Sequence, residues 1–261
     1  MEKVSAVVPC YGEQGLLDMT LSTLMNQTVP FHEIIVVDDG SEKPIVVPHG
    51  IRLIRLERKA GYRGSSAAKN SGASHATGDY LCFSDNDILH MPDALESTMA
   101  FIDENPRRDM LTSLFSVAVT DDDLDAADWL PGDSGAMERL HDHIPFPSGN
   151  MAVVFDSEQQ VACSEQHFAV IRKDYFDSLG GYDSAAFQSW GYNNQDLCLR
   201  ILRGGGKLTS NVSRVHDPDA IAYCFHKYTD ITRDGMVARE EFHAKHGTYF
   251  HPEMLVRYYG T

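Results

Sequence analysis

Residues 80–87 read YLCFSDND, so that four apolar residues lead directly into four polar ones. A short apolar run that ends at turn residues is typical of a buried strand, and we predict a strand over residues 80–83. Pro92 follows, a residue suited to the first turn of a helix, and Asp93 and Glu96 are acidic residues that favour the same position. The segment therefore predicts a strand, a polar turn and a helix.

The residues before this segment repeat the same alternation. Residues 4–8 read VSAVV and residues 34–37 read IIVV, and both runs predict buried strands. Apolar residues recur at roughly helical spacing over residues 16–25, and residues 65–76 form a second, Ala- and Ser-rich helical pattern. Residues 51–56 suggest one more strand. Strands separated by helices imply an α/β fold, with a mostly parallel central sheet and helices on both faces.

The second half of the chain is less regular. The acidic stretch over residues 121–128 is interpreted as a solvated loop. Residues 130–150 lack a clear period and are predicted to form an irregular insertion over the site. Further strands are predicted over residues 110–119, 168–171 and 208–215, and helices over residues 195–203 and 231–246.

Composition excludes several classes of function. The chain has 261 residues, of which 43% are hydrophobic and 23% are charged, as in ordinary globular proteins. Lys plus Arg is 22 and Asp plus Glu is 38, which gives a formal net charge of −16. Such a balance argues against non-specific binding of nucleic acid and against docking on an anionic membrane.

The location of the protein is predicted from its cysteines and its apolar runs. There are five cysteines, an odd number, and no CxxC pair. No run approaches the ~18–20 apolar residues that span a bilayer, and the N-terminus lacks a signal-peptide pattern. We therefore expect a cytoplasmic protein with reduced cysteines, with peripheral contact to a membrane left open.

Three predicted strands end in polar or special residues. The ends are residues 9–13 (PCYGE), 38–41 (DDGS) and 85–87 (DND). In open α/β sheets, ligands bind beyond the carboxyl ends of the strands, so these residues predict a ligand site. Asp85 and Asp87 could also meet one divalent cation, because Mg²⁺ and Mn²⁺ prefer oxygen ligands. The alternative is that the same residues serve only as turns and a helix start.

Six ordered motifs resemble those of the family 2 glycosyltransferases. They are residues 7–13, 35–41, 60–64 with 68–72, 78–87, 180–183 and 190–197. The resemblance covers about residues 4–105 and 165–216. It implies a GT-A fold, with a nucleotide-sugar-binding half over residues 1–110 and a smaller acceptor-binding and catalytic half over residues 111–261 of the same single domain. It also implies a nucleotide-diphosphate sugar donor, with UDP preferred on family frequency, and Mn²⁺ or Mg²⁺ as the cofactor.

The resemblance implies roles for individual residues on the donor side. Asp39 matches a carboxylate that contacts the base, and such a group can accept the uracil N3–H. Asp85 would contact ribose or sugar hydroxyls, and Asp87 would be the metal ligand of the Asp-x-Asp motif. His216 would be a further metal ligand, with His226 as the alternative. The full nucleotide-binding set is Pro9, Tyr11, Glu13, Asp39, Arg63, Lys69, Asp85 and Asn86.

Residues 190–197 match the catalytic segment of the family. Asp196 would be the general base of an inverting transfer and would remove the acceptor hydroxyl proton, whereas Gln195 stands where the family has a second carboxylate. Trp190, Gly191 and Gln195 would contact the sugar or acceptor. A retaining transfer is kept as an alternative, because the segment contains consecutive asparagines, and Gln195 keeps open a non-catalytic module that binds a sugar nucleotide or glycan.

Two other enzyme classes fit the sequence poorly. A sugar-nucleotide pyrophosphorylase should carry a Gly-rich basic loop after the first strand, and an NAD-dependent dehydrogenase should carry GxGxxG there. Residues 9–13 match neither pattern. The expected partners are therefore a nucleotide-sugar donor and a glycan, lipid-linked or small-molecule acceptor, with no nucleic acid.

Overall fold

The computed structural model shows a mixed α/β chain. The residues that it describes are 2–57, 61, 64–104, 109–112, 115–144, 150–151, 153–155, 161–164, 167–189, 191–206, 208–210, 221–224 and 231–247.

A seven-stranded sheet forms the centre of the molecule, in the order β12-β6-β11-β4-β1-β2-β3. Its strands are β1 (Val4–Cys10), β2 (Glu33–Asp38), β3 (Arg52–Arg55), β4 (Tyr80–Phe83), β6 (Met110–Thr112), β11 (Ala169–Arg172) and β12 (Leu208–Ser210). β11 is antiparallel to both of its neighbours, and the other pairs are parallel. The apolar runs in β1 and β4 are buried along their whole length, which is why they lack the alternation of a half-exposed strand.

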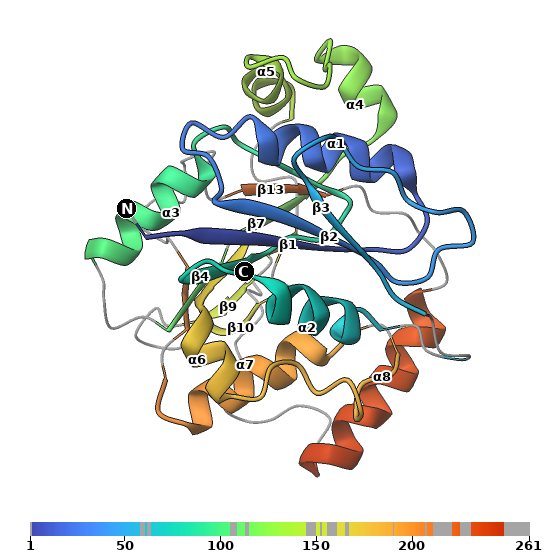
Figure 1. Ribbon diagram of the computed structural model, residues 1–261, viewed down its shortest axis with the longest axis vertical. Coiled ribbons are helices and arrows are strands. Elements are labelled where there is room, and N and C mark those ends of the chain that lie inside the picture. The colour runs from blue at the N-terminus through green and yellow to red at the C-terminus, as the bar shows by residue number, and fades with distance from the viewer. Residues whose placement is uncertain are drawn as a thin grey trace, which may run out of the picture.

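Helices cover both faces of this sheet (Figure 1). α1 (Gln14–Met25) and α3 (Ala94–Glu104) pack on one face, in the apolar cluster that contains Ala6 and Val8 of β1. On the other face, the cluster around Val7 takes in α2 (Ser66–His75), α6 (Lys173–Ser178) and α7 (Asn193–Arg203). A Cβ at Gly72 would lie 2.3 Å from Val7 Cγ1, so glycine allows α2 to lie close against β1.

Two smaller sheets lie beside the central one. One has the order β5-β13-β7-β8, built from β5 (Ile88–His90), β7 (Phe115–Ala118), β8 (Asn150–Met151) and β13 (Ile221–Cys224). The other pairs β9 (Val153–Phe155) with β10 (Val161–Ser164). The single strand predicted over residues 110–119 is therefore divided, because β6 and β7 belong to different sheets. β12 covers residues 208–210 of the strand predicted over residues 208–215, and residues 211–215 lie outside the described part.

The acidic stretch was wrongly predicted to be a loop, because it forms the helix α4 (Asp121–Ala126). Thr120 and Asp123 form a capping box, and three aspartates occupy the first turn, where the helix dipole favours negative charge. The expected irregular insertion contains α5 (Ala136–His143). Apolar residues of this region, Trp129 and Leu140 among them, pack with Leu16 of α1.

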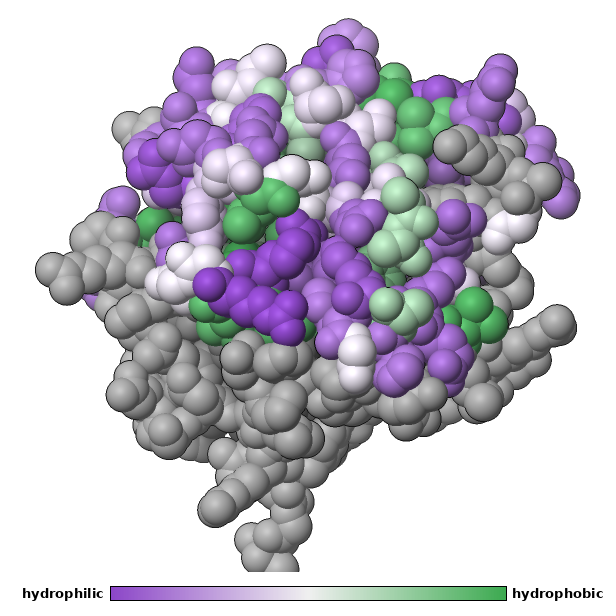
Figure 2. Space-filling view, turned by 90° about the horizontal axis from the view of Figure 1, so that it is seen from below, coloured by the Kyte–Doolittle hydropathy of each residue, from purple (hydrophilic) through white to green (hydrophobic). Residues whose placement is uncertain are grey.

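The last described helix is α8 (Ile231–His246). Its Phe242 is 1% exposed and packs with Phe187 and Leu199. Figure 2 shows that the described residues of the face seen from below are mostly hydrophilic, with small separate apolar patches. No helix in the described ranges is long and apolar enough to cross a membrane.

Candidate functional site

The three polar strand ends meet at one edge of the central sheet. β1 pairs in parallel with both β2 and β4, so that their carboxyl ends point the same way. The Asp39 amide donates to the Cys10 carbonyl over 2.8 Å, and the Ser84 amide donates to the Val7 carbonyl over 3.2 Å. The fold thus gathers the first, second and fourth motifs into one place.

Pro9 lies near the end of β1, and the turn that follows carries Tyr11 and Glu13. Gly12 and Glu13 have φ angles of 68° and 56°, in the left-handed region that favours glycine. The Gly12 amide donates to Ser41 Oγ over 2.8 Å, which ties this turn to the one after β2. Tyr11 is 47% exposed, so part of its ring is presented to solvent beside these turns.

The two aspartates after β2 have different surroundings. Asp38 is fully buried, and its carboxylate accepts from the Ser41 amide over 2.8 Å and from Arg55 Nη1 over 2.5 Å. Asp38 therefore stabilises its own turn. Asp39, the predicted base contact, follows directly and is 6% exposed.

Lys69 and Asp85 lie together at the end of β4. Lys69 Nζ is 3.2 Å from Asp85 Oδ1, and its side chain is only 2% exposed. The same ammonium lies 5.5 Å from the centre of the Tyr182 ring. Two residues predicted to serve the donor are therefore in contact, and a buried cation neutralises the first carboxylate of the Asp-x-Asp motif.

His167 also lies beside Asp85, and the sequence had assigned it no role in the site. The antiparallel register pairs Ala169 with Phe83, and its continuation brings His167 next to Asp85. His167 Nδ1 is 3.8 Å from Asp85 Oδ2. The apolar run of β11 predicted a strand but not its direction, so no signal in the sequence could place this histidine.

α2 connects the donor side to the later motifs. Asn70 Nδ2 donates to the Tyr182 carbonyl over 2.7 Å, and the Tyr182 amide donates back to Asn70 Oδ1 over 2.9 Å. The Gly64 amide donates to the Gln188 carbonyl over 3.0 Å. A Cβ at Gly64 would lie 2.9 Å from the Ser189 carbonyl oxygen, so glycine is needed for this close approach.

The predicted sugar-side residues lead into the first turn of α7. Gly191 and Tyr192 have φ angles of 98° and 56°, and α7 begins at Asn193. Asn193 is 6% exposed. Asn193 Nδ2 and Gln195 Oε1 are buried, and neither has a hydrogen-bond partner among the described residues. Buried polar atoms are nearly always paired, so this turn is suited to the hydroxyls of a ligand.

Asp196 is sealed inside the protein, with a side chain that is 0% exposed. Its carboxylate contacts Arg200 Nε at 2.9 Å, Lys245 Nζ at 2.6 Å and His246 Nε2 at 2.9 Å. A general base must come within hydrogen-bond reach of the proton that it removes. In this structure the carboxylate is buried among three partners, an environment that also suits a structural anion, and the base role of Asp196 stays a prediction.

Two partners of Asp196, Arg200 and His246, make further polar contacts with neighbouring residues. Arg200 Nη1 and Nη2 donate to the carbonyls of Leu179 and Gly181 over 2.9 and 2.7 Å. Arg203 Nη1 lies 3.3 Å from His246 Nδ1. Because an arginine nitrogen can only donate, Nδ1 is the acceptor, so the His246 proton is on Nε2 and faces Asp196. Burial is the largest effect on His246 and lowers its pKa, which favours this neutral form.

The predicted metal site is described only in part. Asp87 is partly exposed after β4, and a carboxylate beside donor phosphates suits Mg²⁺ or Mn²⁺. Across the described ranges, no group of three or more His, Cys, Asp or Glu side chains could hold a metal by itself. His216, Arg63 and Trp190 lie outside the described residues, as does the alternative ligand His226.

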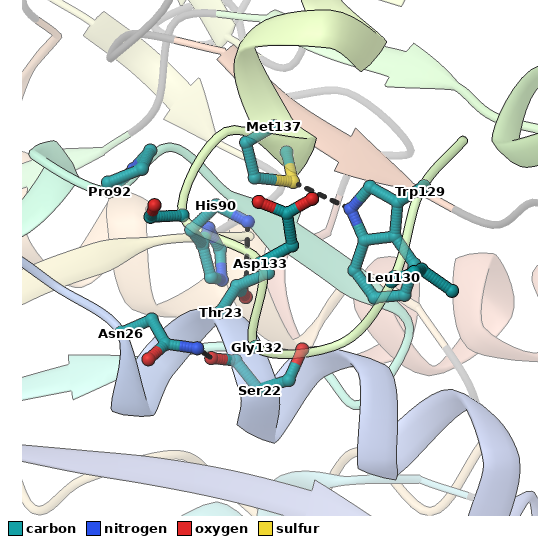
Figure 3. A pocket seen from close by; sticks show the side chains of 11 residues that line it. Ser22, Thr23, Asn26, His90, Pro92, Trp129, Leu130, Gly132, Asp133 and Met137 are labelled. Atoms are coloured by element: carbon teal, nitrogen blue, oxygen red, sulfur yellow. Dashed lines mark hydrogen bonds between the residues drawn. The ribbon is translucent and has the colours of Figure 1, made fainter. Parts of the chain in front are cut away.

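A separate pocket lies between α1 and residues 129–137 (Figure 3). Its lining includes Thr23, His90 and Trp129, and the Trp129 indole N–H donates to Met137 Sδ over 3.3 Å. None of the residues predicted for the donor, sugar or metal is part of this lining.

Comparisons with known proteins agree with the predicted family. The model of Glycosyl transferase family 2 matches residues 5–180. An uncharacterized glycosyltransferase of Haemophilus influenzae is 32% identical over 104 residues, which are 40% of this chain and 35% of that protein. Polypeptide N-acetylgalactosaminyltransferase 11 of Xenopus tropicalis is 27% identical over 226 residues, which cover 78% of this chain and 36% of that protein.

Two further similarities extend the comparison. Validoxylamine A glucosyltransferase of Streptomyces hygroscopicus subsp. jinggangensis is 36% identical over 105 residues, which are 37% of this chain and 25% of that protein. The chain thus spans about a third or less of these three relatives. The crystal structure of S. aureus TarS 1–349 superposes with a TM-score of 0.57 at 16% identity, and the match covers 92% of this chain and 65% of TarS. The expected GT-A fold is confirmed, and because the family model matches more than half of the residues, the chain belongs to glycosyl transferase family 2.

Proposed function

We propose that the protein transfers a sugar from a nucleotide-diphosphate sugar, with UDP as the nucleotide, to a hydroxyl group of a glycan, lipid-linked or small-molecule acceptor. One observation carries the proposal: three polar turns meet at one sheet edge, where buried Lys69 contacts Asp85. Membership of glycosyl transferase family 2 supports the same function. In open α/β sheets, ligands bind beyond the carboxyl ends of the strands, which is where these turns lie.

The donor would lie along this edge. Pro9, Tyr11, Glu13 and Asp39 would contact the nucleoside. Lys69, with Arg63, would face the diphosphate, and Asp85 and Asn86 would contact ribose or sugar hydroxyls. The buried amide nitrogen of Asn86 supports this role, because it has no hydrogen-bond partner in the described part of the chain.

Asp87 and His216 would hold Mn²⁺ or Mg²⁺. When bound there, the ion would supply positive charge that stabilises the diphosphate as a leaving group. Lys69 neutralises Asp85, which leaves Asp87 as the carboxylate of the motif that would serve the ion.

The transferred sugar would lie toward the first turn of α7. Trp190, Gly191 and Gln195 belong to this turn or precede it, and the unpartnered atoms of Asn193 and Gln195 are one donor and one acceptor for sugar hydroxyls.

The surroundings of Asp196 favour retention as a second candidate. Inverting transfer with Asp196 as the base would require the carboxylate to leave its contacts with Arg200, Lys245 and neutral His246 and to reach solvent. A retaining transfer would not use Asp196 as the base, and Asp196 would instead be a contact to the donor sugar. The anomeric configuration of the product, followed by proton NMR during turnover, decides between the two.

A panel of sugar nucleotides tests the proposal. The full chain is incubated with each donor and Mn²⁺, and released nucleotide is measured with and without candidate acceptors. We expect release from a UDP-sugar, and we expect Asp87→Asn to weaken Mn²⁺-dependent UDP binding at least about tenfold, because even outer-shell changes cost 10–100-fold in metal affinity.

Asp93→Asn is the matched control, since Asp93 lies in the turn before α3 and outside the proposed site. Equal UDP affinity in the Asp87 variant and the wild type would contradict the metal assignment. Binding of UDP without release from any donor would favour the non-catalytic binding module.

A further inference from the structure

Arg55, the last residue of β3, closes the turn that follows β2. Its side chain is 44% exposed, yet both terminal nitrogens are engaged. Nη1 donates to Asp38 Oδ2 over 2.5 Å, and Nη2 donates to the Ser41 carbonyl over 2.6 Å. One guanidinium group therefore holds both the first carboxylate and the last carbonyl of the turn.

The carboxylate that Arg55 contacts is fully buried. Asp38 is 0% exposed, and its other oxygen accepts from the Ser41 amide over 2.8 Å. A buried charge is stable only when it is paired and hydrogen-bonded. The Ile45 amide, at 3.5 Å from Asp38 Oδ2, is too distant to replace the guanidinium.

The same turn also holds the turn after β1. Ser41 is 1% exposed, and its Oγ accepts from the Gly12 amide over 2.8 Å. The Asp39 amide donates to the Cys10 carbonyl over 2.8 Å. Asp39 and Tyr11, which the proposed function places against the nucleoside, therefore lie on two turns that are joined through Ser41 and held by Arg55.

We propose that Arg55 is a positioning residue for the nucleoside end of the donor: it fixes the turns that present Asp39 and Tyr11 to the base. This inference rests on the proposed function. The diphosphate end is served by a different set of contacts, because Lys69 lies against Asp85 and Tyr182. Loss of Arg55 should therefore weaken recognition of the nucleoside and spare binding of the diphosphate.

Arg52 provides a matched control on the same strand. It is exposed, and its Nη1 donates to the His75 carbonyl over 3.0 Å, away from the turn after β2. Arg52→Gln removes the same chemical group from β3 without touching Asp38. Arg55→Gln removes both contacts of the turn, whereas Arg55→Lys keeps the charge but cannot make the forked contact.

The experiment measures dissociation constants by isothermal titration calorimetry of the full chain, with Mn²⁺ present. UDP, CDP and pyrophosphate are the probes, and circular dichroism melting checks each variant for folding. In Arg55→Gln we expect the dissociation constant of UDP to rise about tenfold and the preference for UDP over CDP to shrink. Arg55→Lys should show a smaller rise. Pyrophosphate binding, and UDP binding by Arg52→Gln, should stay within about twofold of wild type.

Two outcomes overturn the proposal while leaving the proposed function intact: unchanged UDP affinity in both Arg55 variants, or an equal loss of UDP and pyrophosphate binding in either. Should Arg55→Gln fail to fold, Arg55→Lys decides between the same outcomes. A wild-type chain that binds pyrophosphate but not UDP would contradict the proposed function and this inference together.

Discussion

Asp196 illustrates how distant residues decide what a side chain can do. Its spacing from Arg200 on α7 is i,i+4, a pair that the sequence alone could have indicated. Its other two partners, Lys245 and His246, come from α8, and no local pattern connects them to residue 196. The carboxylate that the family resemblance assigns as the base is therefore buried among three partners.

We predict that the main effect of Asp196→Asn is a lower free energy of unfolding. Removing one partner from a buried ion cluster typically costs several kcal/mol, and we expect a loss of about 3 kcal/mol in the free energy of unfolding. Urea unfolding measures the loss. Asp177→Asn is the control, because the Asp177 side chain is 52% exposed, pairs with Lys173 outside this cluster and should contribute less than about 1 kcal/mol. Wild-type stability together with abolished turnover would instead restore Asp196 as a catalytic base.

His90 predicts a pH dependence of stability. It is 1% exposed, and burial, with a smaller effect from His167, lowers its pKa to about 3. In the unfolded chain this imidazole has the ordinary histidine pKa. The contribution of neutral His90 to the free energy of unfolding is therefore fully present above about pH 6.5, and it is lost as the pH falls toward 3. The slope from this group is at most about 1.4 kcal/mol per pH unit.

Unfolding free energies between pH 8 and pH 4 test this prediction. His90→Gln should flatten the acid side of the curve, whereas the exposed His49→Gln should leave its slope unchanged. An identical slope in wild type and His90→Gln would show that His90 does not carry the effect.

At the scale of elements, apolar runs predicted where strands lie in the sequence better than they predicted the direction in which neighbouring strands pair. β1, β2 and β4 followed directly from buried runs, and their shared edge followed from parallel packing. The direction of β11 did not follow from its sequence, because an apolar run fits either a parallel or an antiparallel strand. The position of His167 depends on that direction and was therefore missed. α4 was missed because an acidic composition was read as solvation, although Thr120 and Asp123 form a capping box.

Two adjacent glycines test how α2 is attached to the later motifs. Gly180 and Gly181 have φ angles of 78° and 69°, so alanine costs backbone strain at both. A Cβ at Gly181 would also lie 2.7 Å from Asn70 Oδ1, whereas no atom lies within 4 Å of one at Gly180. We expect Gly181→Ala to lose about 1–3 kcal/mol more unfolding free energy than Gly180→Ala. Equal losses would show that the contact with Asn70 is not tight.

At the scale of the whole molecule, one sheet joins the first hundred residues to the rest. β6, β11 and β12 extend it beyond β4, so the elements that carry the donor motifs and those that carry the later motifs share a core. The α/β class and the meeting of the three polar strand ends could be predicted from the sequence. The contacts of α8 could not, because they depend on residues about fifty positions apart.

Hydrogen–deuterium exchange of the full chain, with and without UDP and Mn²⁺, tests most directly whether the donor binds where the three strand ends meet. We predict slower exchange in residues 10–13, 38–41 and 84–87 when UDP is bound. Protection confined to residues 129–137, around the pocket of Figure 3, under conditions where calorimetry shows UDP binding, would contradict the account.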